Sequence, residues 1–118
     1  MTAMRESRRP SERRRVPRIQ VELPVTVAWG RKQHKWQAKE FSEYGILVAS
    51  SSKELVGQEV QLGLLLNPDE SPLTVEGTVV YGTDTSIGIR FKNVPQQEQR
   101  ILRAYAQAHG IGIVRPQR

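Results

Sequence analysis

The chain has no cysteine, two histidines and few aromatic residues, which make up only 6% of its 118 residues. Without cysteine it can form neither a disulfide nor a thiolate metal site, and this composition fits a protein of the reducing cytoplasm. His34 and His109 lie far apart in the sequence, and neither has neighbours at metal-ligand spacing. The sequence therefore predicts no metal site.

Features that would mark a membrane protein or an enzyme are also missing. No apolar run approaches the roughly 20 residues that span a bilayer. The N-terminus is charged from Arg5 onward with no apolar segment behind it, so we expect no signal peptide. There is no G-x-S-x-G elbow, P-loop lysine motif or H-E-x-x-H motif. The carboxylates are scattered over predicted turns and exposed strand faces. We therefore expect a cytoplasmic binding domain and not an enzyme.

Positive charge is concentrated at the N-terminus. Residues 1–18 carry seven arginines against two glutamates, a net charge of +5, whereas the remaining hundred residues carry eleven Lys and Arg against ten acids. Such arms attract phosphates, nucleic acid or anionic lipid. We expect residues 1–12 to form a flexible basic arm. The polar, aperiodic part of it up to Ser11 is equally consistent with a disordered, solubilising tail.

After Pro17 the sequence reads as short strands separated by Gly, Pro and polar turns. Apolar residues alternate from Ile19 to Val27, and Pro24 within that run favours an edge strand or a bulge. A turn is expected over residues 30–33. The predicted strands are Ile19–Ala28, Lys35–Ser42, Gly45–Ser50, Glu59–Leu66, Leu73–Tyr81 and Ser86–Phe91. This spacing predicts a mostly-β fold, a six-stranded antiparallel Greek-key-like barrel, because closure removes the sheet edges.

One helix is predicted after the strands. Pro95 opens it, and Gly110 ends it after His109. Ile101, Leu102 and Tyr105 form an apolar stripe, which Ala108 extends, and we expect this stripe to pack on the barrel. A partner-binding helix is the alternative. The domain is accordingly predicted over residues 13–109, with a C-terminal tail over 110–118.

An arginine cluster, residues 13–18, directly precedes the first strand. Arg14 and Arg18 have the spacing Arg-x-x-x-Arg, and Pro17 stiffens the entry to the strand. The planar guanidinium grips phosphate with two hydrogen bonds, stacks on a base and matches the O6/N7 edge of guanine. The same spacing recurs elsewhere in the arm, so it is not specific by itself.

The segment Glu40-Phe41-Ser42-Glu43-Tyr44-Gly45 lies between two predicted strands. Glu40 and Ser42 lie on one side of an extended chain, with Phe41 facing the other way. Gly45 suits a positive φ, which would let the chain turn tightly. A carboxylate can accept hydrogen bonds from guanine, and a hydroxyl can bond phosphate or base. Taken alone, the segment equally describes a tight hairpin with a capping serine.

Together, the two segments resemble the PilZ domain, a receptor module for cyclic di-GMP. That family has an Arg-x-x-x-Arg motif before its first strand, which Arg14 and Arg18 match. Its second motif, Asp/Asn-x-Ser-x-x-Gly, is matched by Ser42 and Gly45. The stretch Ile87–Phe91 followed by a helix also resembles the family, as does Gly57-x-x-Val60-x-Leu62. The resemblance covers about residues 13 to 109.

The resemblance implies a receptor that binds cyclic di-GMP, orders its arm on the nucleotide and signals to an unidentified protein partner. It implies no other cofactor. The residues that the resemblance and the charge pattern assign to the nucleotide are Arg13, Arg14, Arg18, Glu40, Ser42 and Gly45, with Arg9 and Arg15 available for a second ligand molecule. Tyr81 either offers a ring for stacking or is a structural residue of the barrel.

Glu40 departs from the family, which has Asp or Asn at this position. The extra methylene moves the carboxylate by about 1.5 Å, whereas hydrogen bonds tolerate only a few tenths of an ångström. One alternative is therefore an adaptor of the same fold that has lost the nucleotide and acts through protein contacts. A second alternative is a nucleic-acid-binding barrel, although such proteins use several exposed aromatic residues and this chain has few to spare from its core.

Overall fold

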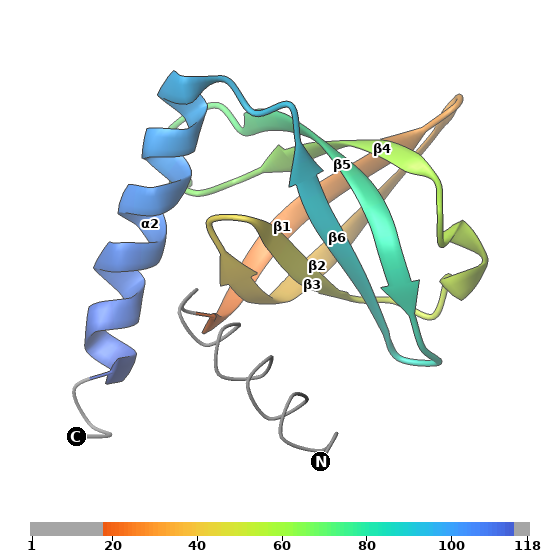
Figure 1. Ribbon diagram of the computed structural model, residues 1–118, viewed down its shortest axis with the longest axis horizontal. Helices are drawn as coiled ribbons and strands as arrows, with labels where there is room; N and C mark the ends of the chain where they lie inside the picture. Colours follow the sequence, from red (N-terminus) through yellow and green to blue (C-terminus); the bar gives the residue numbers. More distant parts are fainter. Residues whose placement is uncertain (1–17, 115–118) are drawn as a thin grey trace, which may run out of the picture.

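The computed structural model describes residues 18–114, which form a closed antiparallel barrel followed by a helix (Figure 1). The strands lie in the order β1-β2-β3-β6-β5-β4, and β4 pairs again with β1. The predicted six-stranded antiparallel barrel with one C-terminal helix is confirmed within these residues. The elements are β1 (Ile19–Trp29), β2 (Lys32–Ser42), β3 (Gly45–Ala49), the 3₁₀ turn η1 (Lys53–Leu55), β4 (Glu59–Leu64), β5 (Leu73–Gly82), β6 (Ser86–Lys92) and α2 (Gln96–Val114).

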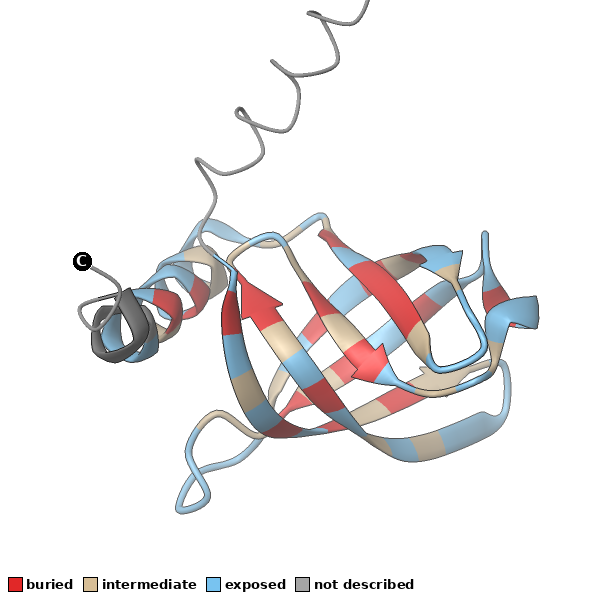
Figure 2. Ribbon diagram, turned by 90° about the horizontal axis from the view of Figure 1, so that it is seen from below, coloured by how far each residue is buried: buried red, intermediate tan, exposed pale blue. Residues whose placement is uncertain are grey.

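Alternation of apolar and polar residues builds the barrel interior. In β1, Leu23, Val25 and Val27 are buried, while Glu22 before them and Pro24 between them are exposed. The same alternation runs through the other strands, so buried and exposed bands succeed each other around the barrel (Figure 2). One continuous core results, in which each strand contributes its inward face.

The register of β1 shifts between Gln20 and Leu23, directly before Pro24. Of the two arrangements predicted from Pro24, an edge strand or a bulge, the bulge is observed. β1 is not an edge strand, because it pairs with β2 on one side and with β4 on the other. Pro24 lies just outside the pairs that β1 makes with β4, and its carbonyl accepts a hydrogen bond from the Leu65 N–H at 3.2 Å. Its missing N–H therefore interrupts no ladder at this point.

The first hairpin is longer than predicted. β2 begins at Lys32 instead of Lys35, and the turn consists of Gly30 and Arg31 only. Gly30 has φ +57°, as the first position of a type II′ hairpin turn requires. The polar residues from Lys32 to His34 carry no strand signal of their own, and their pairing with β1 decides their conformation.

Helix α2 buries Leu102 and Ala106 against the barrel, and Tyr105 meets the Phe41 ring edge-on at 4.9 Å between ring centroids. The expected packing of the helix on the barrel is thus observed for Leu102 and Tyr105. The stripe itself differs from the prediction, because Ile101 is 41% exposed, Ala108 is exposed and Ala106 is buried instead. The predicted end at Gly110 is wrong, since the helix continues to Val114 although Gly110 and Gly112 each lower helix propensity by about 1 kcal/mol. Among the described residues, no helix has the length and apolarity needed to cross a bilayer.

Candidate functional site

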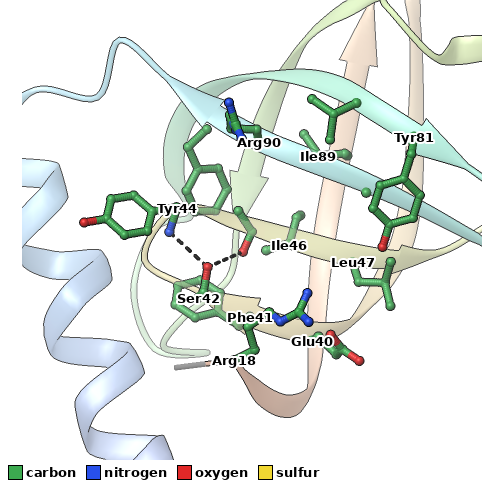
Figure 3. A pocket seen from close by; sticks show the side chains of 14 residues that line it. Arg18, Glu40, Phe41, Ser42, Tyr44, Ile46, Leu47, Tyr81, Ile89 and Arg90 are labelled. Atoms are coloured by element: carbon green, nitrogen blue, oxygen red, sulfur yellow. Dashed lines mark hydrogen bonds between the residues drawn. The ribbon is translucent and has the colours of Figure 1, made fainter. Parts of the chain in front are cut away.

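A pocket of about 550 Å³ lies on the outer face of the barrel, across β2, β3, β5 and β6 (Figure 3). It adjoins the start of β1, where the arginine-rich segment enters the fold. Five residues singled out from the sequence line it together: Arg18, Glu40, Ser42, Gly45 and Tyr81. The other arginines of interest, Arg9, Arg13, Arg14 and Arg15, lie outside the described residues.

The hydroxyl of Ser42 organises the turn between β2 and β3. It accepts a hydrogen bond from the Tyr44 N–H at 3.1 Å and donates one to the Gly45 carbonyl at 3.5 Å. Ser42 is only 7% exposed and pairs with Gly45 across the turn. This is the capping serine that the sequence allowed, and the same residue borders the pocket.

The expectation of a positive φ at Gly45 is wrong, since among the described glycines only Gly30 and Gly57 have positive φ. Glycine is needed at this position for a different reason. A Cβ on Gly45 would lie 2.4 Å from the Ile89 carbonyl oxygen of β6. The turn itself is made by Glu43 and Tyr44, so Gly45 serves the close approach of β3 to β6.

Strand pairing places Arg18 and Glu40 at the edge of this pocket. Ile19 pairs with Phe41, so Arg18 lies at the level of Ser42, and Gln20 pairs with Glu40. A register shift between Ala38 and Glu40 on the β3 side turns the Glu40 side chain outward, half-exposed. A cation and an anion therefore flank the entry to the pocket.

Tyr81 belongs to strand β5 of the barrel, and its side chain is 48% exposed. The register of β5 shifts between Val79 and Tyr81, which turns the Tyr81 side chain to the outer face. Its ring lies over Gly88 of β6, where an added Cβ would come within 2.4 Å of a ring carbon. Gly88 thus provides the surface on which an exposed aromatic ring rests beside the pocket.

Arg90 is a pocket residue that the sequence interpretation missed. It is exposed and pairs with Gly45 on β3, between the buried Ile89 and Phe91. The alternation in β6 indicates that Arg90 faces outward, although Ile87–Phe91 by itself predicts only a strand. Arg18 and Arg90 are the two cations of the described pocket and Glu40 its one carboxylate.

These residues can hold a planar, anionic ligand. Two guanidinium groups supply charge and paired donors for phosphate. The Tyr81 ring supplies a stacking surface, and Leu47 and Val80 beside it are apolar. Because Gly45 and Gly88 lack side chains, the backbone of β3 and β6 forms part of the pocket floor.

Comparisons with known proteins give one family and several similar structures. The family model described as the PilZ domain matches residues 12–108. A comparison with curated proteins finds no match. Among solved structures, the chain is similar to the Bacillus subtilis inhibitor of motility, MotI/DgrA, with a TM-score of 0.69 and 15% identity over 82% of this chain and 51% of the other.

Two further similar structures contain a nucleotide according to their descriptions. The PilZ domain of YcgR from Escherichia coli with c-di-GMP has a TM-score of 0.66 and 15% identity, over 89% of this chain and 96% of that one. PlzA of Borreliella burgdorferi in complex with c-di-GMP has a TM-score of 0.57 and 19% identity, over 75% and 39%. The chain thus spans about half of MotI/DgrA and less of PlzA. At these identities the likenesses establish the fold.

Proposed function

Because this chain belongs to the PilZ domain family, we propose that it is a receptor module, not an enzyme, and that it binds cyclic di-GMP at the pocket over β3 and β6. The observation that carries this proposal is the gathering of Arg18, Glu40, Ser42 and Gly45 around one pocket at the entry of the arginine-rich segment. The nucleotide named in the descriptions of YcgR and PlzA gives further support.

In this proposal the ligand is held from two sides. The phosphates accept hydrogen bonds from Arg18 and from Arg13 and Arg14 of the arm, which folds over the dianion. Glu40 accepts hydrogen bonds from a guanine edge on the barrel side. Tyr81 stacks on a base, and Arg90 adds a cation on the far wall of the pocket. Arg9 and Arg15 remain available for a second nucleotide.

Ligand binding would then act through the arm. An ordered arm over the pocket presents a surface that the free protein lacks, and a partner protein recognises it. The adaptor alternative is favoured by two observations: Glu40 is longer than the family's Asp, and the Ser42 hydroxyl is already engaged within its own turn. An adaptor of that kind would contact its partner without nucleotide.

Calorimetric titration with cyclic di-GMP, with GTP as the control ligand, tests the proposal. Arg14→Ala and Arg18→Ala should each weaken binding by about 1.5–3 kcal/mol, the range for hydrogen bonds to charged groups. Arg31→Ala is the matched control, because Arg31 is an exposed arginine in the β1–β2 turn and does not line the pocket. Equal losses in all three variants would mean that diffuse charge holds the ligand. No binding by the parent protein would favour the adaptor.

A further inference from the structure

Strand β2 extends past the end of β3 toward the hairpin turn. β3 pairs with β2 only from Gln37 onward, where Gln37 faces Ala49. After Ala49 the chain turns away from β2. The Ser50 N–H donates a hydrogen bond to the Thr85 carbonyl at 3.1 Å and not to β2. Within residues 18–114, no strand pairs with the second edge of Lys32–Trp36. This free edge lies at the end of the barrel remote from α2 (Figure 1).

Three aromatic rings contact one another across the hairpin. Trp29 stacks on His34, with ring centroids 4.7 Å apart and an interplanar angle of 7°. His34 in turn stacks on Trp36 at 5.3 Å. All three side chains are half-buried and come from the two paired strands. Cross-strand aromatic contacts stabilise such a hairpin, and β1 is itself paired with β4 over residues 25–28. The free edge is therefore held extended without a strand on its own open side.

The charge around the turn of this hairpin has one sign. Between Arg31 and Lys39 there are four cations and no acid. Lys32 and Lys35 belong to the free edge itself, and both are exposed. Lysines on an edge strand oppose pairing with a second copy of the same edge, because like charges would face each other. Lys32 and Lys35 lie three residues apart and therefore point to opposite faces of β2. On the face of Lys35, a strand with carboxylates at alternate positions is favoured. The other face, which carries Trp36, favours apolar residues between those carboxylates.

We propose that the free edge, Lys32–Trp36, is a docking site for an acidic, extended segment of a partner protein, which adds to β2 as a further strand. The main-chain groups of the edge would supply the hydrogen bonds, and the two lysines would select the partner by charge. The chain's own N-terminal segment is not complementary, because residues 1–18 carry a net charge of +5. The site is separate from the proposed nucleotide pocket, with which it shares no residue.

The test uses the full chain and a capped peptide of about six residues, a usual strand length, in which Glu and Val alternate. The two tryptophans of the chain, Trp29 and Trp36, both belong to the hairpin. Their emission therefore reports binding at this site. Amide exchange of residues 32–36 measures whether the edge becomes paired. We expect an emission change and added protection with this peptide, and neither with a peptide of alternating Lys and Val.

Charge reversal supplies the matched variants. The double variant Lys32→Glu with Lys35→Glu should bind the Glu/Val peptide about tenfold more weakly and should gain binding to the Lys/Val peptide. Lys39→Glu with Arg100→Glu changes the net charge equally at exposed positions off the free edge, and should alter affinity less than about twofold. Thermal unfolding of all variants checks that each remains folded.

Three results would overturn the proposal. The first is no emission change with the Glu/Val peptide. The second is equal binding of a peptide of the same composition without alternation, since strand addition needs the two-residue period. The third is tighter binding of a single-stranded DNA oligonucleotide that is lost in the Lys32→Glu, Lys35→Glu variant, because the aromatic and basic residues would then serve nucleic acid.

Discussion

Arg103 of helix α2 and Glu43 of the β2–β3 turn form an ion pair, with Nε 3.3 Å from Oε2. Glu43 immediately follows Ser42, and its side chain is only 16% exposed. The helix is therefore tied directly to the turn that supplies Ser42 and Gly45 to the pocket. A substitution of Arg103 or of Glu43 should therefore affect both the helix and the turn.

Removing this ion pair should weaken ligand binding, although neither Arg103 nor Glu43 lines the pocket. Arg103→Ala frees the turn, and we expect a two- to fivefold loss of cyclic di-GMP affinity, about the free energy of one partly exposed ion pair. Calorimetric titration measures this loss. Arg100→Ala is the control, since Arg100 is an exposed arginine of the same helix. The charge-exchanged variant Glu43→Arg with Arg103→Glu should regain affinity, and failure to do so would show that the pair has no positioning role.

The Tyr81 ring can be displaced without altering the ring itself. In Gly88→Ala the added methyl group would occupy the position of the ring, so the exposed side chain has to rotate away. We expect cyclic di-GMP affinity to fall as far as in Tyr81→Ala, while the unfolding temperature falls only slightly. Gly63→Ala is the matched control, because its Cβ would meet nothing closer than 3.7 Å. Unchanged affinity in both Gly88→Ala and Tyr81→Ala would remove Tyr81 from the site.

Shortening Glu40 tests the departure from the family motif. Glu40→Asp should tighten cyclic di-GMP binding by at most about 1.5–3 kcal/mol, the free energy of one hydrogen bond to a charged group. Stability should hardly change, because Glu40 is half-exposed at the pocket edge. Titration of the parent and the variant is sufficient. Weaker binding by the variant would show that the longer side chain is already placed for the ligand, and no binding by either protein would favour the adaptor.

Tyr105 makes stability depend on pH in the alkaline range. Burial raises the pKa of Tyr105 above its ordinary value of 10.0. The folded state therefore favours the neutral phenol, and its contribution to stability is complete below pH 10 and is lost as the pH rises through the folded pKa. Urea unfolding at pH 9 and pH 11 should show a larger loss for the parent than for Tyr105→Phe. An equal loss in the two proteins would contradict this assignment.

The barrel was predictable because its strands alternate and their inward residues are aliphatic, as in the run from Leu23 to Val27. The first three residues of β2 could not be predicted as strand, because Lys32 to His34 are polar and only their pairing with β1 makes them extended. The outward direction of Arg90 follows from the alternation of β6, whereas that of Tyr81 does not follow from the alternation of β5. A bulge in β5 reverses the face of Tyr81, and a bulge cannot be read from alternation. The roles given to Arg13 and Arg14 stay predictions, since both lie outside the described residues.

Gly45, which lets β3 approach β6, and Gly88, which lies beneath the Tyr81 ring, also determine where this pocket can be redesigned. At Gly45 and Gly88 the floor is main chain, fixed by the closure of the barrel, and a larger residue at Gly45 would push against the Ile89 carbonyl. The walls at Tyr81 and Arg90 are exposed side chains. An engineer who wants a different anionic ligand should therefore build the library at these two walls, where substitutions leave the barrel intact, and leave both glycines unchanged.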